Sequence, residues 1–223
     1  MSNDQSYAGV VSPRFPASTS TQVITLASRQ RRMRDFFTIP GQMYLALGKS
    51  SAWKDSENPS ISDTTPPIPN GNQTFINELI GVQRITWKKY CKPIINPTTA
   101  EKNQSVEPVY NSGRAVVGYT DGFVEYGGVY YFCTSDYNLA IESGCTGVMI
   151  YTLIEGDDTF QYGVTFRQSG LYVNSTETAR YIGSQQWNNL SDERKGTLEL
   201  ICNWPPHTRY QSANEEIWCL MSF

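Results

Sequence analysis

The sequence is short of histidine and of charge, and it contains no long apolar run. Only 17% of its 223 residues are charged, the formal net charge is -3, and there is one histidine. Because binding to a phosphate backbone needs a concentrated basic field, we expect no nucleic-acid partner. A membrane-spanning helix needs about eighteen consecutive apolar residues, and the sequence contains no such run, so we expect no membrane partner. Residues 1–16 lack the basic start and apolar run of a secretory signal, which favours a protein made in the cytosol.

The shortage of histidine leaves one candidate general base, His207, and its surroundings do not favour catalysis. His207 lies between two loop-favouring residues, and no Gly-x-Ser-x-Gly motif occurs in the chain. The tripeptide Gly-Lys-Ser that begins at Gly48 follows an apolar segment, as in a phosphate-binding loop. Met43 stands where such a loop needs glycine. We therefore expect no catalytic residue and no cofactor, and we interpret Gly48 as a turn that ends a strand.

The last residues, 196–223, predict two strands joined by a proline-bearing loop. Apolar side chains alternate with polar ones in both halves, as in strands with one buried face. The alternating residues are Leu198, Leu200, Cys202 and Trp204 in the first strand, and Ile217, Cys219, Met221 and Phe223 in the second. Antiparallel pairing would set each residue of the first strand opposite one of the second, with Cys202 facing Cys219. The sequence thus predicts a terminal hairpin in the core.

The chain has five cysteines, and none of them forms a Cys-x-x-Cys pair. They are Cys91, Cys133, Cys145, Cys202 and Cys219. With a single histidine to assist them, zinc ligation is not indicated, and we expect no metal site. One interpretation is that the cysteines are small buried apolar side chains. The other is a disulfide between Cys202 and Cys219, which the predicted hairpin places within bridging reach under oxidising conditions.

The composition is typical of a mainly β protein, a β-rich α+β fold with antiparallel sheets, a few short helices and long turn-rich loops. Residues 1–20 predict an extended N-terminal arm and residues 21–223 a single β-rich domain, with a subdivision near 91–112 as an open alternative. β-Branched and aromatic runs between Gly and Asp turns predict a meander. The predicted strands are 43–47, 85–90, 114–119, 129–133, 146–154 and 162–173. The predicted helices are 21–36 capped by Thr21, 73–81 capped by Asn72, and a short turn at 191–194.

Four arginines lie within six residues of the first predicted helix. They are Arg29, Arg31, Arg32 and Arg34. One interpretation is a solvated helix end, at which cations oppose the helix dipole. The functional alternative is an arginine-rich docking surface for a neighbouring subunit, with nucleic acid a distant third.

Carboxylates and tyrosines in the predicted sheet raise the question of a glycosidase, because such an enzyme needs only two facing carboxylates. The carboxylates are Asp121, Glu125, Glu142, Asp157 and Asp158, and the tyrosines are Tyr126, Tyr130, Tyr131 and Tyr137. Asp-Gly and Gly-Asp-Asp are also ordinary hairpin turns, and alternating tyrosine is ordinary in strands. We favour this structural interpretation.

Four stretches, in one order, carry a family resemblance. They read YLALGKSSAWKDSENP from Tyr44, TPPIPNGNQTFINELIGVQRI from Thr65, VTFRQSGLYVN from Val164, and ICNWPPHTRYQSANEEIWCLMSF from Ile201. Together they resemble the gene-eight product family, the baseplate wedge proteins of T-even-type contractile-tailed bacteriophages. Members of that family have a longer middle section, so this chain is similar to a shortened form.

The resemblance implies a structural subunit of a contractile-tail baseplate wedge, without enzymatic activity, located in the virion and assembled in the host cytoplasm. Members of the family are homodimers that contact other wedge proteins and help couple fibre and receptor signals to sheath contraction. Tail-fibre or fibre-attachment proteins are further expected partners. The expected interface or fold-supporting residues are Arg29, Arg31, Arg32, Arg34, Trp53, Pro66, Pro67, Arg167, Pro205 and Pro206.

Two other functions stay open. One is a glycan-binding or fibre-attachment module of the tail, suggested by the tyrosines. The other is a tail-associated hydrolase that uses two of the sheet carboxylates.

Overall fold

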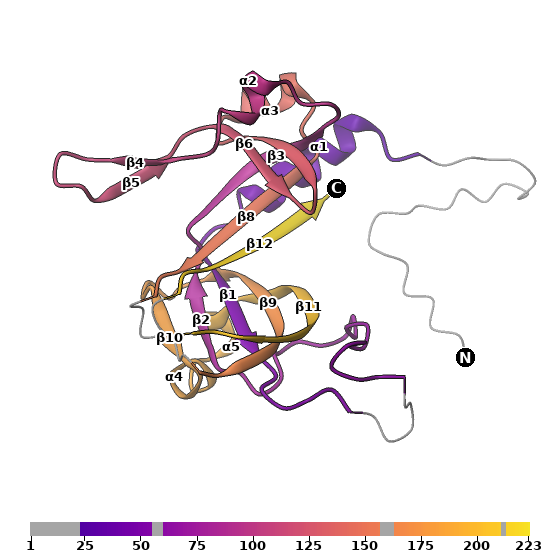
Figure 1. The fold of residues 1–223 in the computed structure, drawn as a ribbon, viewed down its shortest axis with the longest axis vertical. Helices are drawn as coiled ribbons and strands as arrows, with labels where there is room; N and C mark the ends of the chain where they lie inside the picture. The colour runs from indigo at the N-terminus through magenta and orange to yellow at the C-terminus, as the bar shows by residue number, and fades with distance from the viewer. Residues whose placement is uncertain (1–22, 55–59, 157–162, 211–212) are drawn as a thin grey trace, which may run out of the picture.

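Two antiparallel five-stranded sheets organise the chain. The computed structural model of the protein describes residues 23–54, 60–156, 163–210 and 213–223. Within these residues the first sheet has the spatial order β10-β2-β1-β9-β11 and the second has the order β12-β8-β3-β7-β6. Figure 1 shows the second sheet above the first, with α1, α2 and α3 around the second and α4 and α5 beside the first. The fold is mainly β with short helices, as predicted.

The first sheet is built around two long apolar strands. Its members are β1 (Gln42–Gly48), β2 (Gly81–Arg84), β9 (Thr165–Ser175), β10 (Tyr181–Gly183) and β11 (Thr197–Thr208). β1 is central and buried along six of its seven residues, because both of its faces are covered. The predicted strand 43–47 is therefore confirmed.

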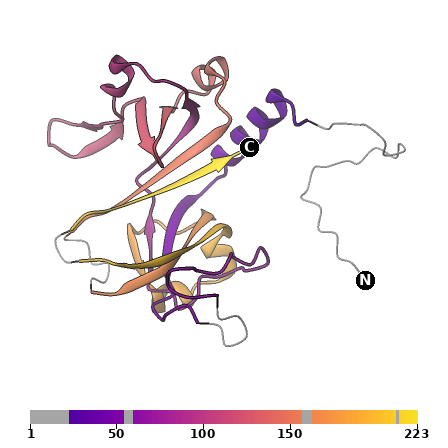
Figure 2. The ribbon, with the colours of Figure 1, turned by 45° about the vertical axis from the view of Figure 1, so that its right-hand side comes forward.

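The second sheet continues into a protruding two-stranded ribbon. The sheet contains β3 (Trp87–Ile94), β6 (Gly122–Tyr126), β7 (Val129–Thr134), β8 (Gly147–Ile154) and β12 (Glu215–Ser222). The ribbon consists of β4 (Pro108–Tyr110) and β5 (Val116–Tyr119), which pair only with each other among the described strands. In Figures 1 and 2 this β4–β5 ribbon projects from the body of the molecule.

Five helices occur among the described residues, and only the first exceeds seven residues. They are α1 (Leu26–Phe37), α2 (Thr99–Lys102), α3 (Tyr137–Ser143), α4 (Ser184–Asn188) and α5 (Asp192–Lys195). Thr25 caps α1, since its side-chain oxygen accepts a hydrogen bond from the Ser28 N–H at 3.2 Å. The predicted cap, Thr21, lies outside the described residues, and the helix begins at Leu26. The predicted turn at 191–194 is confirmed by α5.

The main core lies where the two sheets and α1 meet. Leu45 and Leu47 of β1 belong to the same buried cluster as Val148 and Ile150 of β8. The alternate residues of β1 point to the opposite face of the first sheet, where Tyr44 joins a second cluster. A third cluster covers the outer face of the second sheet and includes Trp87, Cys91, Val124, Cys133, Met149 and Tyr151.

The predicted terminal hairpin is wrong. β11 pairs with β9 in the first sheet, so that Cys202 lies opposite Ser169. β12 pairs with β8 in the second sheet, so that Cys219 lies opposite Ile150. The alternation of both strands was detected correctly, but β9 and β8, from other parts of the chain, supply the pairing partners.

The predicted meander is also wrong. β7 lies between β3 and β6, while β8 lies between β3 and β12. β9 belongs to the other sheet. A strand from an earlier part of the chain, β3, thus takes the place next to β7 that sequence order would give to β8.

The predicted helix at 73–81 is absent. The backbone of this segment instead bonds to β1 and to the residue just after β1. The Lys49 N–H donates to Asn77 O at 2.6 Å, and the Ile80 N–H donates to Leu47 O at 2.8 Å. Asn72 does not cap a helix; its N–H donates to the Asn70 side chain at 3.0 Å. Tertiary pairing therefore outweighs the local helical pattern.

The predicted strand at 85–90 is split between the two sheets. Ile85 N–H donates to Met43 O in the first sheet at 3.1 Å, and Thr86 N–H donates to Tyr151 O in the second at 2.8 Å. The surface excursion predicted from Cys91 begins only after Ile94, because Cys91–Ile94 form the end of β3.

Candidate interaction site

The loop after β1 is fastened by one carboxylate. Glu78 accepts hydrogen bonds from Lys49 Nζ, Ser50 Oγ and the Ser51 N–H, each at 2.8 Å. The Lys49 ammonium and the Ser51 hydroxyl are the main reasons that the pKa of Glu78 lies far below its usual range. Lys49 is thus engaged with an internal anion, and Gly48 ends the strand as predicted. A Cβ atom at Gly48 would lie 2.4 Å from Asn77 O, so only glycine fits there.

A buried arginine joins the same loop to the first sheet. Arg167 of β9 donates to both carboxylate oxygens of Asp63, at 2.8 and 2.9 Å, and to the Ser50 carbonyl at 2.5 Å. The Trp53 N–H donates to the same carboxylate at 2.8 Å. Arg167 is the first cause of the lowered pKa of Asp63, followed by the Trp53 N–H. This fork geometry uses the planarity of the guanidinium group, which lysine lacks.

Trp53 and Trp204 extend this network toward β11. The Trp53 indole N–H donates to the Trp204 carbonyl at 3.0 Å, and the Trp204 indole N–H donates to Ser169 Oγ at 2.9 Å. Trp53 retains only 8% of its exposure. Both indole groups therefore have polar partners in a largely buried environment.

Gln168 and Asn203 hold the proline-rich turn. Gln168 Oε1 accepts from the Asn77 N–H and Gln168 Nε2 donates to Asn203 Oδ1, both at 2.8 Å. Asn203 Nδ2 then donates to the Pro67 carbonyl at 2.9 Å. We call the whole set the loop anchor. Its members are Lys49, Ser50, Ser51, Trp53, Asp63, Glu78, Arg167, Gln168, Asn203 and Trp204.

The structure therefore brings together several residues that the resemblance singled out. Trp53 and Arg167 belong to the loop anchor, and Pro67 is bonded to it. Pro66 is half-buried beside Pro67. Sequence reasoning missed Asp63 and Glu78, since a single carboxylate in a polar loop carries no signal of its partner far along the chain.

Pro205 and Pro206 follow Trp204 of the loop anchor directly, on an edge strand. Both are exposed, and the pairing of β11 with β9 is interrupted between Asn203 and His207. Proline cannot donate to the ladder, so an irregular edge is where it is tolerated.

The arginine-rich helix presents most of its cations outward. Arg29, Arg31 and Arg34 are exposed and Arg32 is half-buried. Met33 and Phe36 of the same helix enter the core. The Gln30 side chain fixes the helix by donating to the Ile141 carbonyl at 3.2 Å. Arg34 lies 3.4 Å from Asp35 and 5.9 Å from the centre of the Tyr137 ring.

The cysteines are free thiols, and four of the five are buried. Cys202 is exposed, whereas Cys91, Cys133, Cys145 and Cys219 are buried. The cross-strand geometry that suggested a disulfide between Cys202 and Cys219 does not exist. Burial raises the pKa of Cys133 and of Cys219 to about 12, which makes these thiols poor nucleophiles at neutral pH.

Asp121, one of the carboxylates considered for sugar chemistry, and His207 each form a structural pair. Asp121 binds the buried Lys89 ammonium at 2.8 Å, and His207 Nε2 lies 2.8 Å from Glu215, which joins β11 to β12. Asp157 and Asp158 lie outside the described residues. Among the described residues no cluster of His, Cys, Asp and Glu is suited to a metal ion, and none of their helices is long and apolar enough to span a membrane.

The four tyrosines considered for sugar stacking are only half-exposed. Tyr126 and Tyr131 pack against the third cluster, and Tyr137 packs against the main core. Tyr137 also lies near Tyr90, whose pKa is raised by burial and, to a smaller extent, by the neighbouring Tyr137 phenol. Three of the four rings, Tyr126, Tyr131 and Tyr137, therefore contribute to packing.

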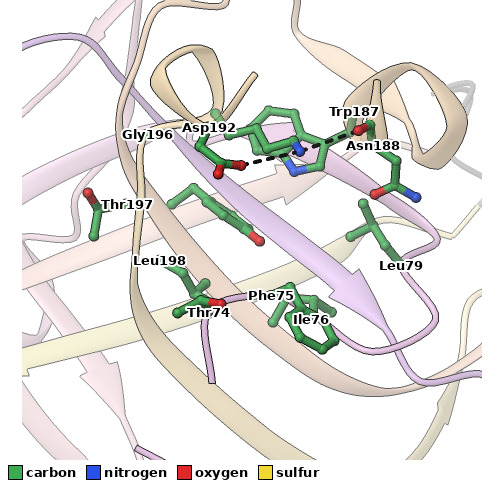
Figure 3. A pocket seen from close by; sticks show the side chains of 12 residues that line it. Thr74, Phe75, Ile76, Leu79, Trp187, Asn188, Asp192, Gly196, Thr197 and Leu198 are labelled. Carbon is green, nitrogen blue, oxygen red and sulfur yellow. Dashed lines mark hydrogen bonds and ion pairs between the residues drawn. The ribbon is translucent and has the colours of Figure 1, made fainter. Parts of the chain in front are cut away.

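A pocket of about 400 Å³ lies on the other face of the first sheet, and we call it the Trp187 pocket. Figure 3 shows side chains of the loop before β2 facing those of α4, α5 and the start of β11 across it. Trp187 retains 1% exposure and packs between Tyr44 and Tyr172, whereas Phe75 at the rim is 60% exposed. Lys195 Nζ lies 3.4 Å from the Asn188 carbonyl and 3.8 Å from Asp192. The residues that line the Trp187 pocket are Thr74, Phe75, Ile76, Leu79, Tyr172, Trp187, Asn188, Asp192, Lys195, Gly196, Thr197 and Leu198.

A family model described as "Baseplate wedge 3 tail fiber network component" matches residues 22–223. The match covers both sheets, all five helices and the complete loop anchor. No curated protein matches the chain.

Proposed function

We propose that this chain, which belongs to the baseplate wedge 3 tail fiber network component family, is a structural subunit of a contractile-tail baseplate wedge. It would assemble in the host cytoplasm and bind other wedge proteins, and tail-fibre or fibre-attachment proteins would be further partners. The observation that carries the proposal is the family match over residues 22–223. We further propose that the subunit is a homodimer and helps couple fibre and receptor signals to sheath contraction.

The loop anchor supports a mechanical role. It joins the described parts of the segment between β1 and β2 to β9 and β11 through hydrogen bonds and the Arg167–Asp63 ion pair, and the Lys49–Glu78 ion pair links the two ends of that segment. A rigid loop loses little conformational freedom when a partner binds. We propose that Trp53, Pro66, Pro67 and Arg167 maintain the shape of a wedge contact, rather than bind the partner through their own side chains.

The arginine face of α1 is a second proposed contact. Arg29, Arg31 and Arg34 are exposed, and their positive charges suit an acidic surface on a neighbouring subunit. Replacing the three by glutamine should weaken incorporation into particles more strongly at low than at high salt, because exposed charge pairs are screened. Unchanged incorporation at every salt concentration would remove α1 from the interface.

Immunogold electron microscopy of purified particles tests the proposed location. An antibody against this chain should label the tail end near the baseplate with six-fold distribution, and antibody pre-absorbed with the purified protein is the control. Label on the distal fibres would instead favour the fibre-attachment alternative. Particles without label would contradict both.

The Trp187 pocket favours one second candidate, a glycan-binding module. It combines an exposed aromatic ring, Phe75, with the polar rim residues Asn188, Asp192 and Thr197, a mixture that suits sugar rings. A glycan array that gives no signal above that of a Phe75→Ala variant would exclude it. For the hydrolase alternative, incubation with host-surface polysaccharide should release no new reducing ends, since Asp121 is held by Lys89.

A further inference from the structure

Cys91 and Cys133 lie directly opposite each other in the second sheet. Cys91 belongs to β3 and Cys133 to β7, and the two are Cα partners in the antiparallel register of these strands. The side chains of directly opposite residues point to the same face of a sheet. Both thiols belong to the third cluster, where Cys91 is 1% and Cys133 is 0% exposed. The structure thus places two buried thiols beside each other.

The backbone of Cys91 shows which kind of cross-strand pair this is. In antiparallel strands, pairs that exchange backbone hydrogen bonds alternate with pairs that do not, because both backbone groups of a residue point to the same neighbouring strand. The Cys91 carbonyl points toward β8, since it accepts a hydrogen bond from the Thr146 N–H at 3.2 Å. Toward β7, Cys91 therefore occupies a non-hydrogen-bonded position.

The backbone around Cys133 leads to the same conclusion from the other strand. Phe123 of β6 donates to Gln104 O at 2.7 Å and accepts from the Val106 N–H at 3.3 Å, so its backbone groups point away from β7. The adjacent residue Gly122, which is the partner of Cys133, therefore points its backbone groups toward β7. The backbone groups of Cys133 then point to β6, and Cys133 faces β3 at a non-hydrogen-bonded position.

The geometry of a non-hydrogen-bonded pair matches that of a disulfide. The Cα atoms of such a pair lie about 4.5 Å apart, and disulfides span Cα separations of about 4.4–6.8 Å. Both cysteines are free thiols in the structure, and Cys91 Sγ lies over Gly147 of β8, since a Cβ atom at that glycine would lie 3.2 Å from it. Because the Cα separation already suits a bridge, rotation of the Cys91 side chain toward β7 is the main movement that bridge formation requires.

The remaining three cysteines have no thiol opposite them. Cys202 lies opposite Ser169, and Cys219 lies opposite Ile150. Cys145 belongs to the main core rather than to the third cluster. The cross-strand arrangement therefore singles out one pair among the five cysteines.

We propose that Cys91 and Cys133 form an oxidisable dithiol site, which a low-molecular-weight disulfide such as oxidised glutathione converts to a cross-strand disulfide. One protein thiolate attacks a sulfur of the oxidant and releases a first small thiol. The second protein thiolate then attacks the protein sulfur of this mixed disulfide and releases a second small thiol. The two cysteines together lose two protons and two electrons, and the oxidant gains them. Because both thiols are buried, the reaction proceeds through local opening of the sheet and is slow.

The bridge would fasten the part of the chain that carries the ribbon. It closes residues 91–133 into a loop that contains α2, the β4–β5 ribbon and β6. Such a cross-link stabilises a protein mainly by restricting its unfolded chain. Disulfides form in oxidising surroundings and are kept reduced in the cytosol, so in a virion component the bridge would close after release from the host. This timing rests on the proposed function, whereas the dithiol site itself does not.

Oxidation of the purified full-length protein tests the site. The protein carries Cys202→Ser, which removes the exposed thiol, and is incubated with oxidised glutathione at a urea concentration just below the unfolding transition, where local opening is more frequent. After unfolding and alkylation, peptide mass spectrometry should find Cys91 linked to Cys133, with Cys145 and Cys219 alkylated. Without urea, the oxidised protein should unfold at a Tm roughly 4–16 °C above that of the reduced protein, and a reductant should reverse the shift.

Cys133→Ala and Cys145→Ala are matched variants in the same background, because each removes one buried sulfur atom. The rise in Tm on oxidation should disappear in Cys133→Ala and remain in Cys145→Ala. Alkylation of both Cys91 and Cys133 after prolonged oxidation would overturn the inference, however the variants fold. A bridge that lowers Tm would also overturn it, because the native sheet would then not suit the bridge. Neither result would affect a wedge location seen by immunogold.

Discussion

Replacement of Lys89 by methionine should destabilise the protein and loosen the ribbon at its root. Lys89 is 1% exposed, and its ammonium has three partners, namely Asp121 and Ser135 Oγ at 2.8 Å and the Tyr119 carbonyl at 3.2 Å. Methionine fills a similar volume but donates no hydrogen bond. Asp121 and two neutral acceptors would lose their common donor.

The size of the destabilisation in Lys89→Met depends on how far water can replace the lost hydrogen bonds. Breaking a fully buried ion pair costs about 3–5 kcal/mol. The Asp121 side chain is 37% exposed and keeps hydrogen bonds from Thr134 Oγ1 and the Ser135 N–H, so partial hydration reduces the penalty. We expect a loss of about 2–3 kcal/mol in the free energy of unfolding. For a chain of this size that corresponds to a decrease of roughly 4–12 °C in Tm.

Thermal unfolding followed by circular dichroism measures the global effect, and hydrogen exchange measures the local one. Lys54→Met is the control, because Lys54 is exposed and should change Tm little. Amide exchange should accelerate in β4 and β5 more than in β1. A Lys89→Met protein as stable as the control, with unchanged exchange in the ribbon, would refute the idea that this buried cation fixes the ribbon.

The same variant should alter the dependence of stability on pH. Although burial acts to raise the pKa of Asp121, hydrogen bonds from Lys89, Thr134 and the Ser135 N–H outweigh it and lower the pKa. Since the folded pKa is below the unfolded one, this carboxylate stabilises the protein above the unfolded pKa, and the contribution is lost as pH falls through the folded pKa. In Lys89→Met the part of this acid-side slope that is due to Asp121 should shrink.

Three further predictions concern the loop anchor and the thiols. Arg167→Met should cost about 2–3 kcal/mol and speed proteolysis between Ser50 and Asp63, measured by urea unfolding and gel assay, whereas unchanged cleavage would contradict a fastening role. Glu78→Gln should lower the free energy of unfolding by about 1 kcal/mol at pH values above the unfolded pKa of Glu78, a modest loss because the carboxylate is 40% exposed. The stability of the variant should also fall less steeply in acid than that of the wild type. An unchanged pH profile of urea midpoints would contradict this prediction. Ellman's reagent should react rapidly with one thiol of the native protein, and Cys202→Ser should abolish that phase; a remaining rapid phase would show that a buried cysteine is accessible.

The sequence predicted the strands better than their partners. Alternation along residues 197–204 and 215–223 identifies β11 and β12, because a side-chain period of two is local information. Which edge each strand pairs with depends on β9 and β8, which lie elsewhere in the chain and compete for the same backbone groups. No local pattern reports the outcome of that competition.

The helix predicted at 73–81 failed for a related reason. Its apolar stripe is real, since Ile76 and Ile80 are buried, but the burial is achieved in an extended loop that bonds to β1. Two apolar residues four positions apart satisfy either arrangement. The Leu47 carbonyl of β1, which accepts from Ile80, and the Lys49 N–H just after β1, which donates to Asn77, favour the extended arrangement.

The candidate site was predictable only as a set of unconnected residues. The resemblance singled out Trp53, Pro67 and Arg167, whereas Asp63 and Glu78, which bind the loop, carry no local signal. Charge pairing across more than a hundred positions of chain, as between Arg167 and Asp63, becomes visible only when the fold is known. The strand predicted at 114–119 overlaps β5, but its pairing with β4 in a separate ribbon was missed, because its apolar residues resemble those of any buried strand.

The strands of the two five-stranded sheets alternate along the chain, and this limits where the protein can be cut into fragments. The chain passes from one sheet to the other three times, after β2, after β8 and after β11. A single cut between β3 and β11 therefore leaves strands of both sheets in each fragment. Neither fragment would own a complete layer, so split halves expressed together should regain structure only by folding around each other, and neither should persist alone in a cell. For a particle component, this means that a nascent chain is committed to its final shape only when β12 has been synthesised and has closed the second layer.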